Sequence, residues 1–89
     1  MTEKQSAALQ ELRAKSMQTI QIETAVTWAH RAWAAKQLAS TEMAAGHTAD
    51  AWRLSHDAVE YEHEALEHAA LSDSDEVLPL VRRIINDAS

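Results

Sequence analysis

The residues of this chain that could do chemistry are histidines and glutamates on one predicted helix. His56, Glu60, His63 and Glu67 follow one another at intervals of four, three and four residues. Residues three and four apart are neighbours on a helix surface, so this spacing aligns the side chains along one ridge. Imidazole and carboxylate groups are ligands that zinc and iron use in proteins. With His30 from a neighbouring helix, the residues Glu60, His63 and Glu67 therefore form a candidate metal site.

A second feature of the same ridge is its Glu-x-x-His spacing from Glu60 to His63, which resembles the motif of ferritin-like di-iron bundles. In that family, a glutamate from a neighbouring helix completes each half-site. Here the facing segment around His30 has no glutamate, and Glu23 is the nearest, about two turns away. The alternative interpretation is a solvent-exposed network of His and Glu contacts. A metal-binding helical protein is thus one function hypothesis, with zinc or iron as the ion.

Catalytic motifs are missing from the sequence. It has no cysteine nucleophile, no glycine-rich phosphate loop and no nucleophile-elbow sequence. Ser55, His56 and Asp57 are consecutive, so on a helix they point in three directions and cannot act together. We therefore expect a protein that is not an enzyme and that has no catalytic residues.

The charge balance bears on the kind of partner. Fourteen acidic and eight basic residues give a formal net charge of −6, and the pI is about 5.2. Nucleic-acid affinity comes largely from Lys and Arg, so binding to DNA or RNA is disfavoured. The charge would suit an acidic inhibitor or antitoxin-like protein that binds a basic target, which is a further function hypothesis. No stretch approaches the roughly 20 apolar residues of a membrane span, and the N-terminal segment does not resemble a signal peptide, so we expect a cytoplasmic protein that does not bind membranes.

The elements that would position these residues are helices. Before Pro79 the chain has no proline and one glycine, Gly46, and it is rich in Ala, Leu, Glu and Gln, which favour helices. We predict one all-α domain with helices over about 3–45, 49–71 and 75–87. Gly46 can adopt the left-handed conformation that ends a helix, so the first two helices are expected to form an antiparallel hairpin.

The apolar faces of the two long helices predict how they pack. Residues 25–44 place their apolar side chains on one face, and residues 51–70 do the same. Many of these residues are alanines, which permit close approach, and Trp28, Trp33 and Trp52 are expected mainly to fill the flanks of this core. Trp28 lies at the edge of its face and is the best of the three for contact with a partner.

A break in this pattern occurs near the N-terminus. Leu9, Leu12, Met17 and Ile20 lie opposite the apolar face that follows them. Either the first helix bends at residues 21–24, or it is straight and its N-terminal third packs on something other than its own hairpin. A second copy of the chain is the simplest candidate.

Two charged residues lie within the apolar faces, Lys36 on the first helix and Glu62 on the second. With a turn centred at residues 47–50, an antiparallel hairpin would place them side by side. Because an unpaired buried charge costs several kcal/mol, we predict a partly buried structural ion pair between them. The alternative is that the Lys36 stem extends to the edge of the seam and Glu62 lies in a hydrated groove.

Together these observations favour a small acidic protein that acts through protein–protein interaction. We expect a homodimer that completes a helical bundle, or an adaptor or regulatory module that docks on another helical protein. The C-terminal helix is also too apolar on one side to be left in water. The predicted interface residues are Leu9, Leu12, Met17, Ile20, Trp28, Leu80 and Ile84.

Overall fold

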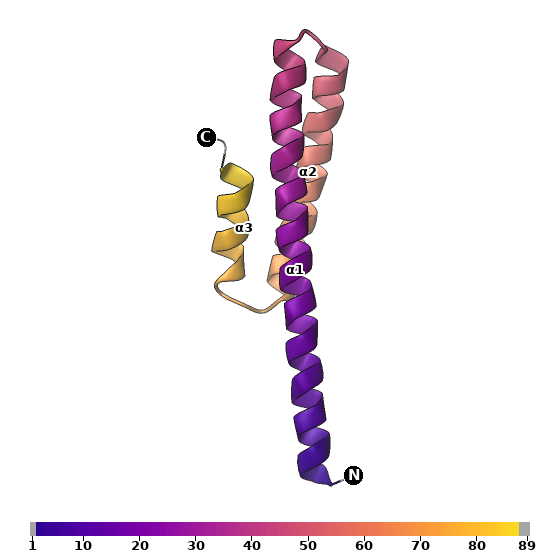
Figure 1. Ribbon diagram of the computed structural model, residues 1–89, viewed down its shortest axis with the longest axis vertical. Helices are drawn as coiled ribbons and strands as arrows, with labels where there is room; N and C mark the ends of the chain where they lie inside the picture. The colour runs from indigo at the N-terminus through magenta and orange to yellow at the C-terminus, as the bar shows by residue number, and fades with distance from the viewer. Residues whose placement is uncertain (1, 88–89) are drawn as a thin grey trace.

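The computed structural model describes residues 2–87, and these form three helices. They are α1 (Glu3–Ala44), α2 (Thr48–Leu71) and α3 (Val77–Asn86). Helices α1 and α2 form the antiparallel hairpin predicted from the sequence, and α3 lies beside its lower half (Figure 1). The all-α fold is therefore confirmed. Within residues 2–87, no helix combines the length and the hydropathy needed to cross a membrane.

The turn between α1 and α2 depends on Gly46. Its φ angle is +84°, in the left-handed region. The Gly46 amide donates to the Met43 carbonyl at 3.1 Å, and the His47 amide donates to the Glu42 carbonyl at 2.8 Å. These two bonds satisfy the last carbonyls of α1 in the pattern of a Schellman motif. The predicted role of the glycine is confirmed.

Replacing Gly46 with alanine is expected to lower the free energy of unfolding by about 1 kcal/mol, because an L-residue with a Cβ is strained at positive φ. No atom lies within 4 Å of the position of an added Cβ, so backbone strain accounts for the whole effect. Urea denaturation followed by helical circular dichroism measures it. Gly46→Asn is the control and should cost less, because asparagine tolerates this conformation. Equal losses for both variants would contradict the argument.

Alanines form the seam between α1 and α2. They are at most 8% exposed and recur at intervals of three, four or seven residues, which keeps them on one face of each helix. Such small side chains let the two backbones approach closely. The buried seam comprises Ala25, Ala29, Ala32, Ala35 and Ala39 of α1 and Ala51, Ala58, Ala65 and Ala69 of α2.

The register of the hairpin differs from the prediction. Gln21 contacts His68, and Trp28 contacts Tyr61, so the numbers of paired residues total 89 rather than about 97. Most of the difference arises because the turn comprises residues 45–47 and is centred on Gly46, whereas the prediction centred it at residues 47–50.

This register separates Lys36 from Glu62. Their numbers total 98, nine more than the observed register, which places them roughly 13 Å apart along the hairpin axis at 1.5 Å per residue. The predicted ion pair is therefore wrong: within residues 2–87, no ion pair joins Lys36 and Glu62. Both residues are only partly buried, so each charge remains hydrated at the edge of the seam.

Helix α3 supplies the large apolar side chains of the core. Val77, Val81 and Ile85 are at most 4% exposed and pack in one cluster with alanines of α1 and α2. The helix begins at Val77, two residues later than predicted, and Pro79 lies in its first turn, where no intrahelical donor is needed. At about 15 Å long, α3 covers only part of the hairpin.

The first helix is not broken at residues 21–24. It runs as one uninterrupted helix from Glu3 to Ala44, and its N-terminal third extends beyond the other two helices (Figure 1). Of the two predicted alternatives, the structure therefore has the straight helix. This makes the molecule elongated, with extents of 66 × 21 × 13 Å.

Candidate functional site

The part of α1 that extends beyond the hairpin is the main candidate site, and we call residues 3–20 the arm. Every residue of the arm is exposed. It nevertheless carries four large apolar side chains, which we call the arm stripe: Leu9, Leu12, Met17 and Ile20, with exposed fractions of 38%, 62%, 55% and 53%. Single exposed apolar residues are common, but a row of four on an unpartnered helix indicates an interaction surface.

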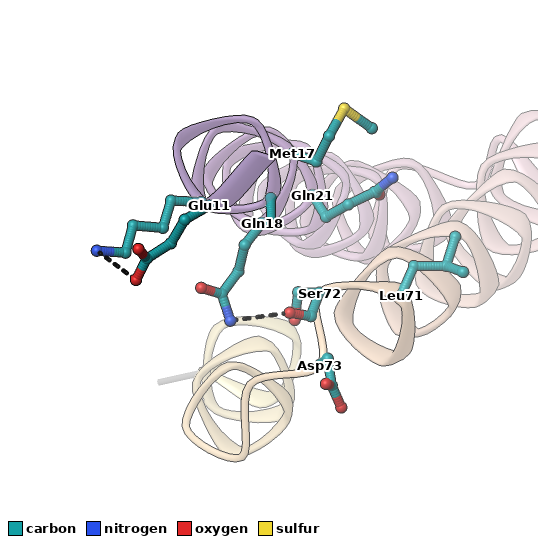
Figure 2. Close-up of a pocket in the computed structure, with 9 residues that line it drawn as sticks. Glu11, Met17, Gln18, Gln21, Leu71, Ser72 and Asp73 are labelled. Atoms are coloured by element: carbon teal, nitrogen blue, oxygen red, sulfur yellow. Dashed lines mark hydrogen bonds and ion pairs between the residues drawn. The ribbon is translucent and has the colours of Figure 1, made fainter. Parts of the chain in front are cut away.

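The geometry of a straight helix fixes where the arm stripe points. At 100° per residue, Leu9, Leu12 and Ile20 lie within an arc of about 80°, and Met17 lies about 60° beyond its edge, in the direction of Ala35. This arc is opposite the alanine face that contacts α2. Figure 2 shows Met17 pointing away from the turn that carries Ser72 and Asp73. Leu9, Leu12 and Ile20 are therefore accessible on the side away from the hairpin, whereas Met17 lies near the end of α2, with Leu71 and Ser72.

A notch of about 390 Å³ marks the junction between the arm and the hairpin. In it, Gln18 Nε2 donates to the Ser72 carbonyl at 3.0 Å, and His68 Nδ1 lies 2.6 Å from Gln21 Oε1 (Figure 2 shows the first contact). Ser72 is buried, and its hydroxyl donates to the Ala69 carbonyl at 2.6 Å. These bonds fix the end of α2 to α1, so the arm projects from a well-defined base.

Two of the predicted interface residues pack mainly on their own chain. Trp28 is half-buried, with its ring centroid 5.4 Å from that of Tyr61 and the Arg31 guanidinium 4.9 Å above its ring. Ile84 is half-buried against the core cluster. Leu80 is 41% exposed and remains accessible on the outer side of α3. The surface available to a partner is therefore concentrated in the arm stripe.

Sequence reasoning missed a second apolar surface near the hairpin turn. Met43, Trp52 and Val59 are 52%, 70% and 65% exposed, although all three were expected in the core. Met43 and Val59 line a groove of about 660 Å³ between α1 and α2. Trp33 is also 36% exposed, although its indole N–H donates to the Asp87 carbonyl. The expectation that Trp52 fills the flank of the core is wrong because α3 is too short to reach the turn.

The predicted metal site is not assembled. Within residues 2–87, no group of three potential ligands includes His30, His63 or Glu67. His30 is exposed, and its Nδ1 lies 3.0 Å from the Val26 carbonyl of the same helix. Glu60 pairs with His56 at 3.6 Å on the surface of α2. The histidines and glutamates of this ridge therefore make only local contacts, because residues on one ridge are spread along the helix axis.

Two other groups bring three potential ligand atoms within 4.8 Å of one another. One consists of Glu42, His47 and Asp50 at the hairpin turn, where His47 Nδ1 lies 2.5 Å from Glu42 Oε2. Asp50 of this group is also bonded to Arg53 at 3.1 Å. The other group combines His56 and Glu60 with Asp57 on α2. Both groups lie on the surface, where contacts of this kind are common in acidic helical proteins.

Comparison with known proteins adds no family to these observations. No protein-family model, no curated protein and no solved structure matches the chain.

Proposed function

We propose that this protein is a non-enzymatic interaction module that binds a helical polypeptide through the arm stripe. The observation that carries the proposal is the coincidence of two features in one segment. The arm is the part of α1 without a neighbouring helix, and three of its four large apolar residues, Leu9, Leu12 and Ile20, point away from the hairpin. An apolar helix face without a partner is what a second helix would cover.

The energetics of the arm support the same proposal. Full burial of a Leu, Ile or Met side chain contributes about 1.5–3 kcal/mol, so covering four half-exposed side chains offers on the order of 4 kcal/mol. An isolated helical segment of this length is marginal in water, and contact with a second helix would stabilise it. A partner would therefore gain apolar contact and order the arm at the same time.

The test is site-specific photo-crosslinking in the native host at the natural expression level. A photoreactive amino acid replaces Leu12 in the arm stripe and, in a control variant, Leu38, which is similarly exposed but lies beside the hairpin. We expect a covalent adduct with a polypeptide from position 12 and none from position 38. No polypeptide adduct from position 12, or the same adducts from both positions, would overturn the proposal.

A further inference from the structure

We infer that the partner of the arm is a second copy of this chain, aligned antiparallel along α1; this inference rests on the proposed function. The first observation is the amount of exposed surface. The chain exposes 6537 Å². A folded monomer of its mass, 9.9 kDa, would expose about 5200 Å² by the usual scaling of surface with mass. The surplus of roughly 1300 Å² exceeds the approximately 800 Å² that each partner buries in a standard interface.

The radius of gyration shows independently that the chain is less compact than a typical domain of its length. Its radius of gyration is 17.7 Å. A compact domain of this length would have a radius of about 12 Å. The excess comes from the arm, which projects as a single helix (Figure 1). One chain therefore forms only part of a compact helical bundle, and a second copy can supply the missing neighbour of the arm.

The positions of the arm stripe residues define the alignment. If the numbers of facing residues total 29, Leu9 faces Ile20 of the second copy, and Leu12 faces its Met17. Each apolar residue is then level with an apolar residue, with Met17 at the flank of the contact, and the twofold axis passes between Ala14 and Lys15. Residues 3–26 of the two copies lie side by side, while α2 and α3 of each copy lie on the outer sides.

Charge favours this antiparallel alignment over a parallel one. In a parallel pair, Arg13 would lie beside Arg13 of the other copy and Glu23 beside its Glu23, both at the margins of the stripe. In the antiparallel pair, Arg13 is level with Ser16 and Glu23 with Ser6, so no like charges are level with each other. The helix dipoles also oppose each other, which is the favourable arrangement.

The oligomeric state is measured by sedimentation equilibrium of the full chain. We expect a dimer for the wild type and, for Ile20→Asp, a dissociation constant raised at least about 100-fold, because the symmetric interface contains the substitution twice. The matched control is Leu38→Asp. Leu38 has the same exposed fraction as Ile20, 53%, and lies five full helical turns further along the same side of α1. It should leave the dimer intact. A wild-type monomer at about 100 µM with its helix content intact would overturn the inference.

Disulfide trapping tests the orientation, because the chain has no cysteine of its own. Ser16→Cys lies close to the twofold axis and should form a disulfide between copies. Glu23→Cys alone should not. A mixture of Glu23→Cys and Gln5→Cys should give the mixed dimer, because Gln5 is one residue from the level of Glu23 and lies on the stripe side of the helix. Trapping of Glu23→Cys with itself would show a parallel pair and overturn the alignment. A photo-crosslink from Leu12 to a different protein, with a monomeric wild type, would overturn self-association and leave the proposed function standing.

Discussion

Replacing Val81 with aspartate is expected to lower the free energy of unfolding by about 3–5 kcal/mol and to detach α3 from the hairpin. Val81 is 0% exposed and lies in the cluster that joins α3 to the alanines of α1 and α2. A carboxylate at this position would be buried without a cationic partner. Because small domains have a total stability of only about 5–15 kcal/mol, a loss of this size is a large part of the whole. Urea denaturation monitored by circular dichroism gives the free energy.

The adjacent residue provides the control for this prediction. Leu80 is 41% exposed on the outer side of α3, so Leu80→Asp places the same charge on the same helix in contact with water. Its effect on the free energy of unfolding should stay below about 1 kcal/mol, which is typical of surface substitutions. Similar losses for Val81→Asp and Leu80→Asp would show that helix α3 does not hold the core together.

The helices and their pairing could be predicted because the relevant signals are local. Gly46 is the one residue of the first two helices and their turn that favours positive φ, and it does adopt this conformation. The buried alanines recur with the period of a helix, so the face of each helix that packs could be read directly from their spacing. The position of the arm stripe opposite that face follows from the same period and needs no tertiary information.

The register, meaning which residue of α2 lies opposite a given residue of α1, could not be predicted in the same way. Helical periodicity gives the direction of a side chain around the axis, but it does not give its partner along the axis. The register depends on where the turn is centred, and a shift of the turn moves Lys36 away from Glu62. The predicted grouping of metal ligands has the same weakness, since within residues 2–87 His30, His63 and Glu67 belong to no group of three potential ligands.

The exposure of Trp52 shows that the apolar face of a helix does not by itself predict which of its large side chains are buried. Its place on the apolar face of α2 predicts a core residue, yet it is 70% exposed. Two helices alone cover little of each other beyond their alanine seam, so large side chains at the flanks are buried only where a third helix reaches them. Helix α3 reaches the lower half of the hairpin, and its length cannot be inferred from the face of α2.

The alanine seam leads to the second large effect that we expect. Replacing Ala65 with leucine should lower the free energy of unfolding by about 3 kcal/mol. Ala65 is 0% exposed in the cluster that joins all three helices, so a larger side chain must push α1 or α3 away from α2. Ala70→Leu is the matched control on the exposed side of the same helix. Since leucine and alanine both favour helices, it should change the free energy by less than about 0.5 kcal/mol. If both variants unfolded at the same urea concentration, close packing of small residues would not be what holds the hairpin together.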